Sequence, residues 1–308
     1  MPPEPRPTAP AVIGVQSLLF HTPVESIERM LAALDNSSRI GLAEGLCTGF
    51  TVTLGDGSST RVLDDDDVVR LQAAHPHLHE VKYHWFGWNV GTSRGHNAMA
   101  ELIAEPTHLI FSNPDVVPEP RAIWRMLEVF DDPAVGFVEA KQLPIEHPKD
   151  FASGTGETGW ATTAFAMTPK DLFLELGGFD EESFFMYCDD VDYSWRVREA
   201  GRSVIYQPAA VVFHDKYLSL DGAWQPTGAE VKYSARAALA LAHKWSRPGL
   251  VKKILQGYEH PDALPAHQEA AAEFRRRQKR GLLPEPRDPE HQISMFKNSR
   301  YAEHRFPL

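Results

Sequence analysis

The chain has 308 residues, of which 43% are hydrophobic, and it carries a formal net charge of −11 at pH 7. This acidic balance argues against general nucleic-acid binding, which needs a basic surface. The two cysteines, Cys47 and Cys188, lie far apart and without metal-ligand spacing, which excludes a disulfide framework. No signal peptide or bilayer-spanning apolar run is present in the sequence, so we expect a soluble, cytoplasmic protein with a disordered, proline-rich tail at residues 1–10.

Strand-like and helical segments alternate over the first 141 residues. Apolar or alternating runs predict strands at residues 11–20, 49–54, 80–86, 107–113 and 134–141. Apolar residues at helical spacing predict helices at residues 23–37, 64–75, 92–105 and 120–132. This alternation is typical of βαβ units and a parallel sheet, whose ligands bind at the carboxyl ends of the strands. The segments that should share this edge are GDGSS (55–59), WNVGTSRGHN (88–97) and SNPDV (112–116).

The alternation ends after residue 142. A loop is expected at residues 144–160, and its GTGETG run (154–159) matches G-x-G-x-x-G without following a strand, so it is not interpreted as a dinucleotide-binding motif. Beyond the loop, the pattern predicts helices at 169–176 and 190–200, a strand at 203–213 and a helical tail. The basic run RRRQKR (275–280) is interpreted as a solvated helix face, with contact to an anionic membrane surface as the alternative.

The SNPDV segment contains the first candidate site. Asp115 follows a predicted strand, with Asn113 two residues before it. A carboxylate and an amide at a sheet edge suit a hard divalent cation that takes its other ligands from water and phosphate oxygens. A capping Asx-turn explains the same residues equally well.

The second candidate is YCDDVDYSWR (187–196), with Asp189, Asp190 and Asp192 beside aromatic residues. Acidic residues in the first turn of a helix stabilise it, which is the structural explanation. The functional explanation is a general base whose pKa is raised by aromatic walls. His214 ends the last predicted strand, where a histidine is more often a hydrogen-bonded edge residue than a metal ligand.

Three segments in this order resemble the family 2, GT-A type glycosyltransferases, particularly the rhamnosyltransferase-like and galactofuranosyltransferase-like members. They are NVGTSRGHN (89–97), FSNPDVVPEP (111–120) and residues 175–215, which include GGFDEESFFMYCDDVDYSWR. The resemblance covers roughly residues 11–245. It implies an α/β GT-A fold with a doubly wound, mostly parallel, Rossmann-like sheet. Its parts would be a nucleotide-sugar-binding half (11–118), an acceptor-binding half (119–245) and a helical and irregular C-terminal extension (246–308).

The resemblance also implies roles for individual residues. Asp190 would be the general base, with Asp189 beside it, and Mn²⁺ or Mg²⁺ would be held by Asp115 and His214. Donor contacts are expected from Asp56, Asn89, Gly91, Asn97, Asn113 and Asp115, with Arg94 added as a phosphate or sugar contact. Acceptor contacts are expected from Trp160, Tyr187 and Asp192.

The expected reaction is an inverting transfer of a sugar from a nucleotide diphosphate, dTDP or UDP, to a hydroxyl of a glycan, glycolipid or small glycoside. One alternative is a catalytically silent GT-A domain, since Asn113 replaces an acid and Thr162 and Thr163 replace small residues. Another is a nucleotidyltransferase, but FHTPVES (20–26), after the first strand, is not a glycine-rich, basic phosphate loop. An oligomer and peripheral contact with the inner membrane face through the basic C-terminal helix remain open.

Overall fold

The computed structural model describes residues 10–103, 105–145, 150–216, 227–297 and 300–301. Nine residues of the expected disordered tail lie outside these ranges. The strands are β1 (Ala11–Leu19), β2 (Cys47–Asp56), β3 (Glu80–Trp85), β4 (His108–Ser112), β5 (Val116–Pro118), β6 (Val135–Leu143), β7 (Phe165–Pro169) and β8 (Ser203–His214). The helices are α1 (Val24–Glu44), α2 (Asp65–Ala74), α3 (Thr92–Leu102), α4 (Ala122–Leu127), α5 (Lys170–Glu175), α6 (Asp189–Glu199), α7 (Gly228–Lys244), α8 (Pro248–Tyr258) and α9 (Pro265–Lys279), with the 3-10 helix η1 (Glu128–Asp131).

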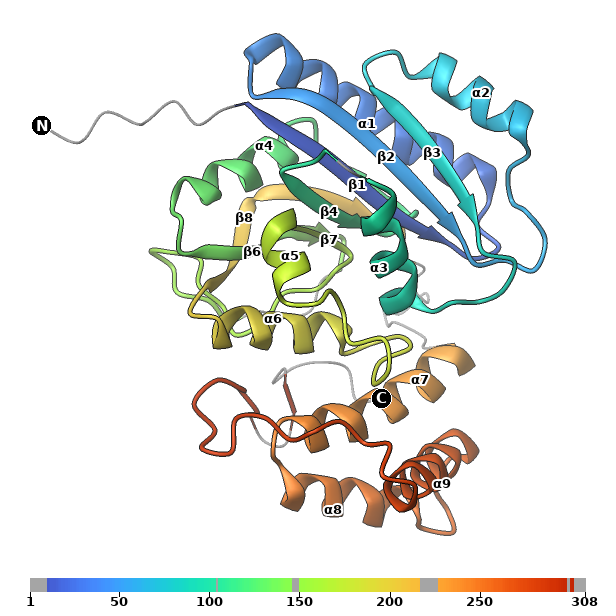
Figure 1. The fold of residues 1–308 in the computed structure, drawn as a ribbon, viewed down its shortest axis with the longest axis vertical. Coiled ribbons are helices and arrows are strands. Elements are labelled where there is room, and N and C mark those ends of the chain that lie inside the picture. The colour runs from blue at the N-terminus through green and yellow to red at the C-terminus, as the bar shows by residue number, and fades with distance from the viewer. Residues whose placement is uncertain (1–9, 104, 146–149, 217–226, 298–299, 302–308) are drawn as a thin grey trace, which may run out of the picture.

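These strands form one sheet in the order β3-β2-β1-β4-β7-β6-β8-β5 (Figure 1). The pairs among β3, β2, β1 and β4 are parallel, and β6 pairs with β8 in parallel. β7 runs antiparallel to both β4 and β6, and β5 runs antiparallel to β8. The carboxyl ends of β1, β2, β3, β4, β6 and β8 therefore lie at the same edge, and the predicted mostly parallel sheet is confirmed.

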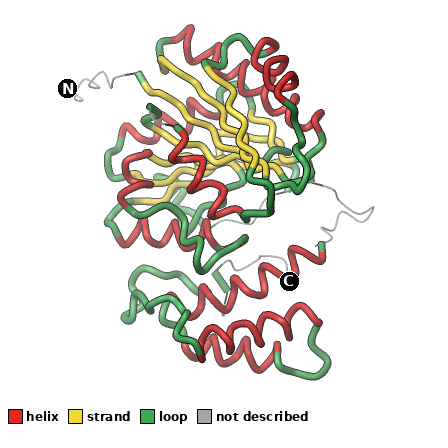
Figure 2. The backbone as a smooth tube through the Cα atoms, turned by 45° about the vertical axis from the view of Figure 1, so that its right-hand side comes forward, coloured by secondary structure: helices red, strands yellow, loops and turns green. Residues whose placement is uncertain are grey.

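Helices cover both faces of the sheet because side chains alternate along each strand. In β4, Ile110 belongs to a buried cluster with residues of α1, α2 and α4, whereas Leu109 and Phe111 belong to a cluster with residues of α3, α5 and α6. Figure 2 shows the sheet between these helical layers. Among the described helices, none combines the length and the apolar character needed to cross a membrane.

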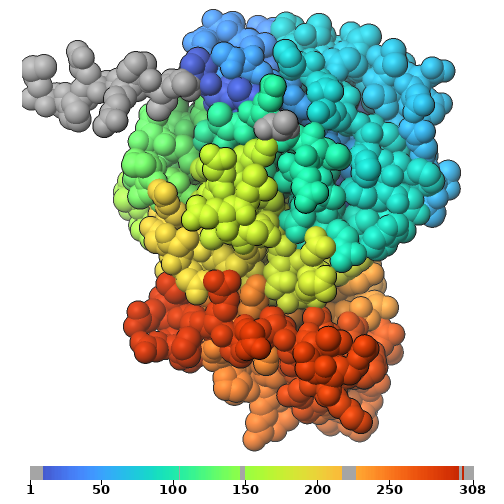
Figure 3. Space-filling model, in the orientation of Figure 1, coloured from blue at the N-terminus to red at the C-terminus, as the bar shows by residue number. Residues whose placement is uncertain are grey.

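The helices α7, α8 and α9 form a smaller unit beneath the sheet (Figures 1 and 3). Their own buried cluster includes Ala235 and Leu239 of α7, Leu255 of α8 and Phe274 of α9. Helix α7 also packs against α6 through a second cluster around Trp195 and Trp245. The boundary predicted at residue 245 therefore comes directly after α7, a helix that packs against α6 on one side and against α8 and α9 on the other.

The segment after α9 returns to the unit that contains the sheet. The guanidinium of Arg198 in α6 donates to the backbone oxygen of Ile293. The ring of Phe296 packs against Trp195 with centroids 5.0 Å apart, and Tyr301 packs against Trp160 at 5.2 Å. Residues after α9 thus cover Trp160 and Trp195, which lie on the side of the sheet that carries α6.

The sequence did not indicate β5 or β7, which have three and five residues. The helix predicted at 120–132 is instead α4 followed by η1. The helix predicted at 23–37 continues to Glu44 as α1, and the other predicted helices and strands are present with boundaries shifted by a few residues.

Candidate active site

The sheet edge brings the predicted turns together. Leu19 of β1 pairs with Asp56 of β2, and Asp56 pairs with Trp85 of β3, so the turns after these strands start in one row. The SNPDV turn follows β4 and leads into β5, whose Val116 pairs with His214 of β8. Residues separated by about a hundred positions in the sequence therefore meet at this edge.

Asp115 and His214 form a pair of possible metal ligands. Asp115 Oδ1 lies 3.4 Å from His214 Nε2. The His214 side chain is 6% exposed, whereas that of Asp115 is 42% exposed, so the carboxylate faces the open side. Two ligands of one octahedral cation, each about 2.1 Å from it, lie roughly 3 Å apart, and this pair fits that separation.

Gln142 fixes the orientation of His214, although no motif in the sequence points to this residue. His214 Nδ1 lies 2.8 Å from Gln142 Oε1. Because an amide oxygen only accepts, Nδ1 is the donor in this contact, so Nε2 faces Asp115 and offers its lone pair whenever the imidazole is neutral. Within the residues that the structure describes, no group of three or more His, Cys, Asp or Glu side chains could hold a metal. A cation here would need substrate oxygens and water to complete its shell.

Asp189 begins α6 after two residues in an unusual backbone conformation. Tyr187 and Cys188 have φ angles of 68° and 59°, in the left-handed region that non-glycine residues rarely adopt. Asp189 Oδ2 accepts hydrogen bonds from the hydroxyls of Thr92 at 2.8 Å and Ser93 at 3.2 Å. These bonds connect α6 to the first turn of α3, and both hydroxyls lie within the NVGTSRGHN motif.

The two adjacent carboxylates have different surroundings. Burial and the neighbouring charge of Asp190 raise the pKa of Asp189 to about 7, despite the hydrogen bonds from Thr92 and Ser93. Asp189 is 3% exposed, whereas Asp190 is half-buried. Asp190 is therefore the one of the two that an incoming molecule can reach.

The raised pKa of Asp189 predicts a pH-dependent stability. Between about pH 4 and 7 the folded chain keeps a proton that the unfolded chain releases, so the free energy of unfolding falls as pH rises through this range. Each pKa unit corresponds to about 1.4 kcal/mol, so the loss should reach a few kcal/mol. Urea unfolding at pH 5 and pH 8 measures this change. From pH 5 to pH 8, the free energy of unfolding should fall less in Asp189→Asn than in the unmodified chain. Equal decreases in the two proteins would contradict the raised pKa of Asp189.

Asp56 is fully buried at the carboxyl end of β2. Its carboxylate accepts from the backbone N–H groups of Ser58 and Val62, each at 2.8 Å, and from the Tyr83 hydroxyl at 2.5 Å. Burial opposes ionisation, but hydrogen bonds from Ser58, Tyr83 and Val62 outweigh it and lower the pKa of Asp56. The carboxylate is thus charged and organises the turn; its predicted contact with the nucleotide stays a prediction.

Gly91 sits where α3 begins, with φ at 75°. A Cβ atom there would lie 2.3 Å from the backbone oxygen of Phe185, so this close approach requires glycine. Asn89 Oδ1 accepts the Gly91 N–H at 3.2 Å and shapes the same turn. The backbone N–H of Asn113 donates to Ala164 at 2.9 Å, which ties the SNPDV turn to the residues before β7.

Arg94 and Asn97 lie on α3 and contact the turn around Glu181. Arg94 Nε donates to Glu181 Oε1 at 2.9 Å, and Asn97 Nδ2 donates to Glu181 Oε2 at 3.0 Å. Asn97 also exchanges hydrogen bonds with the backbone of Phe179. The described contacts of both side chains are thus with protein groups, and their predicted donor contacts are untested.

Asp192 differs most from its expected acceptor role. It is fully buried, and its carboxylate accepts from Arg196 Nε at 2.8 Å, Lys244 Nζ at 2.8 Å and Trp245 Nε1 at 3.0 Å. Lys244 also contacts Asp180 at 2.7 Å. The carboxylate is surrounded by groups of α6 and α7, so we assign it to holding these helices together and not to the acceptor.

The other two expected acceptor residues lie near this helix pair. Trp160 is 6% exposed and belongs to the cluster that includes Phe184, Trp195 and Trp245. Tyr187 is partly buried against the same cluster. Their contact with an acceptor remains a prediction.

Sequence comparison gives a partial match. No family model matches the chain. Over 58 residues the chain is 40% identical to the N-acetylglucosaminyl-diphospho-decaprenol L-rhamnosyltransferase of two Mycobacterium tuberculosis strains, CDC 1551 / Oshkosh and H37Rv. The match spans 19% of this chain and 19% of the length of these curated relatives.

Solved structures share the fold over most of the chain. GalNAc-T7 with UDP, GalNAc and Mn²⁺ has a TM-score of 0.62 at 12% identity, covering 88% of this chain and 55% of that one. The mannosyltransferase PcManGT from Pyrobaculum calidifontis, in complex with GDP-Man and Mn²⁺, has a TM-score of 0.55 at 18% identity, covering 91% and 84%. The fold is that of the GT-A glycosyltransferases, and the predicted fold class is confirmed.

Proposed function

We propose that the chain is an inverting glycosyltransferase that moves a sugar from a nucleotide diphosphate to an acceptor hydroxyl. The observation that carries the proposal is the Asp115–His214 pair, in which the contact with Gln142 at Nδ1 leaves Nε2 facing the carboxylate. The GT-A fold and the partial match to a rhamnosyltransferase support it. Family 2 membership is part of the proposal and rests on the motifs.

Asp115 and His214 would hold Mn²⁺ or Mg²⁺, and Mn²⁺ is present in both similar structures. The bound cation would offset the negative charge that develops on the leaving diphosphate. Asn113 lies in the same turn, and Asn89 and Gly91 shape the turn before α3 on the donor side of the sheet edge. We propose dTDP or UDP as the nucleotide of the donor.

Asp190 would act as the general base. Its carboxylate is half-buried, so an acceptor hydroxyl can reach it and transfer a proton as the oxygen bonds to the anomeric carbon. One displacement from the face opposite the nucleotide inverts that carbon. Asp189 would be a positioning residue. Its hydrogen bonds from Thr92 and Ser93 connect the start of α6, which carries the base, to the start of α3, which lies on the proposed donor side. A single carboxylate base suffices because the leaving diphosphate is a stable anion, in contrast to glycosidases, which use two carboxyl groups.

The proposed acceptor is a hydroxyl of a glycan, glycolipid or small glycoside. The name of the mycobacterial relatives describes a sugar on a diphospho-decaprenol, which supports a glycolipid. The basic residues 275–280 of α9 and the residue after it could then contact the anionic inner face of a membrane from the cytoplasm. An oligomer would be compatible with all of these assignments.

Metal-dependent nucleotide binding tests the proposal. We expect UDP or dTDP with Mn²⁺ to raise the melting temperature, because a ligand that binds only the folded chain stabilises it. The same nucleotide without metal, and Asp115→Asn with both, should give little or no rise. Asp66→Asn, which alters an exposed acid in α2, should behave as the unmodified chain does.

The panel should also include GDP and CDP, each with and without Mn²⁺. A metal-dependent rise with one of these would retain the transferase but change the donor. No rise with any nucleotide would contradict the proposal and favour the catalytically silent domain, for which the replacement of an acid by Asn113 is the supporting observation.

A further inference from the structure

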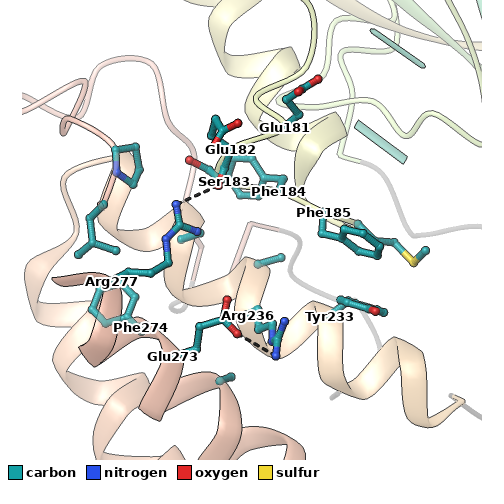
Figure 4. A pocket seen from close by; sticks show the side chains of 16 residues that line it. Glu181, Glu182, Ser183, Phe184, Phe185, Tyr233, Arg236, Glu273, Phe274 and Arg277 are labelled. Carbon is teal, nitrogen blue, oxygen red and sulfur yellow. Dashed lines mark hydrogen bonds and ion pairs between the residues drawn. The ribbon is translucent and has the colours of Figure 1, made fainter. Parts of the chain in front are cut away.

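A cavity of about 310 Å³ lies between the turn that precedes α6 and the helices α7 and α9 (Figure 4). Residues 181–186 line it on the catalytic side. Tyr233 and Arg236 of α7, with Phe274 and Arg277 of α9, line the other side. Its volume is at the lower end of the range for small-molecule sites. Most of the second wall thus comes from the helical unit beneath the sheet.

The cavity shares a wall with the proposed catalytic carboxylates. The backbone oxygen of Phe185 accepts the Thr92 N–H at 2.8 Å, and the Thr92 hydroxyl donates to Asp189 at 2.8 Å. The Phe185 ring instead stacks on Tyr233, with centroids 4.7 Å apart and planes at 28°. The same residue therefore borders the carboxylates with its backbone and the cavity with its side chain.

The lining does not favour an anion. Arg236 is ion-paired with Glu273 at 2.8 Å, and Arg277 donates to the backbone oxygen of Glu182 at 2.9 Å (Figure 4). Two guanidinium groups in the lining face three carboxylates, those of Glu181, Glu182 and Glu273. Arg94 pairs with Glu181 and Glu182 from outside the lining, so three guanidinium groups balance three carboxylates and the cavity has no net positive charge that would attract an anion.

The same groups suit a neutral sugar. Carboxylates only accept hydrogen bonds and guanidinium groups only donate them, and a sugar hydroxyl does both. Phe185 and Tyr233, which are partly exposed, add aromatic surface on which the apolar face of a sugar ring can pack.

We propose that this cavity binds a neutral saccharide unit of the acceptor, remote from the hydroxyl that reacts. The link to the acceptor rests on the proposed function, whereas saccharide binding by the cavity does not. The C-terminal helices then supply part of the acceptor specificity through Arg236 and Arg277.

Saturation-transfer difference NMR on the full chain, with a panel of neutral methyl glycosides and disaccharides, tests this directly. We expect at least one of them to bind. Arg277→Ala should weaken that binding about tenfold, which corresponds to about 1.4 kcal/mol. The matched control is Arg276→Ala, which removes an exposed guanidinium from the same helix outside the lining, and it should leave binding unchanged.

A second pair of variants guards against a folding defect in Arg277→Ala. Leu283→Trp should fill the cavity and weaken saccharide binding about tenfold, because Leu283 is partly buried in its lining. Leu282→Trp changes its neighbour, which is 48% exposed and outside the lining, and should have no effect.

Three results would overturn the proposal: no neutral saccharide binds, binding is unchanged in both Arg277→Ala and Leu283→Trp, or pyrophosphate or glucuronate binds there in place of neutral sugars. Metal-dependent nucleotide binding should persist in all four variants. If the unmodified chain bound a saccharide but no nucleotide with metal, the proposed function would be refuted, whereas the proposed saccharide site would be retained.

Discussion

Asp190→Asn should reduce sugar transfer by about 10²- to 10⁴-fold, the range that a positioned general base contributes. The amide keeps the shape of the side chain but cannot take the proton of the acceptor hydroxyl. Because Asp190 is not a proposed metal ligand, nucleotide binding with Mn²⁺ should remain near that of the unmodified chain. Single-turnover transfer assays, paired with melting-temperature shifts, measure the two quantities separately.

Asp66→Asn provides the matched control, since it makes the same chemical change in an exposed acid of α2. Transfer at the unmodified rate by Asp190→Asn would refute the assignment of the base. A large loss in Asp189→Asn with little loss in Asp190→Asn would exchange the two roles.

Lys244→Met should destabilise the fold by about 3–5 kcal/mol, the usual cost of leaving a buried charge without its partner. Lys244 is 7% exposed and contacts Asp180 and Asp192, of which Asp192 is fully buried. Without the lysine, the two carboxylates retain one guanidinium, that of Arg196, in contact with Asp192. Urea unfolding at pH 7 measures the change.

Two further variants sharpen this test. Arg275→Met breaks the exposed pair with Glu259, whose side chains are 52% and 44% exposed, and should cost less than about 1 kcal/mol. Asp180→Asn, added to Lys244→Met, should restore part of the lost stability because it removes the uncompensated charge. A loss of similar size in Lys244→Met and Arg275→Met would contradict the special role of the buried pairs.

Acid should weaken the same cluster. Burial opposes ionisation of Asp180, but the charge and hydrogen bond of Lys244, with bonds from Ser183, lower its pKa overall. A carboxyl whose folded pKa is lowered contributes stability above its unfolded pKa and loses it as pH falls through the folded value. This dependence has the opposite sign to that of Asp189, so the two groups can be distinguished by the pH range in which unfolding changes.

The local sequence pattern was sufficient to predict the parallel strands of the sheet and the turns at its edge. Each of β1 to β4 is an apolar or alternating run, and the chain order of strand and helix then places the turns that follow these strands together. Asp115 and His214 were both singled out, but their pairing depends on β5, which has only three residues. A strand that short carries no periodicity of its own.

The remaining contacts depend on packing between distant segments. Gln142 reaches His214 across 72 residues, and no spacing in the sequence indicates it. β7 is antiparallel within a mostly parallel sheet, and the described residues between β6 and β7 contain no helix that would complete a βαβ unit. Asp192 lies one helical turn after Asp189, as predicted, but the position of α7 decides that it meets Lys244 and Trp245.

The return of the segment after α9 has a consequence for how the chain acquires its structure. Arg198 meets Ile293 across 95 residues, and Trp160 meets Tyr301 across a longer separation. During synthesis, the segment that contains Trp160 and Trp195 therefore emerges from the ribosome long before the residues that cover these two side chains. Until the C-terminal segment is synthesised, these indole rings lack its cover. The nascent chain then exposes an aromatic, aggregation-prone surface that chaperones can bind.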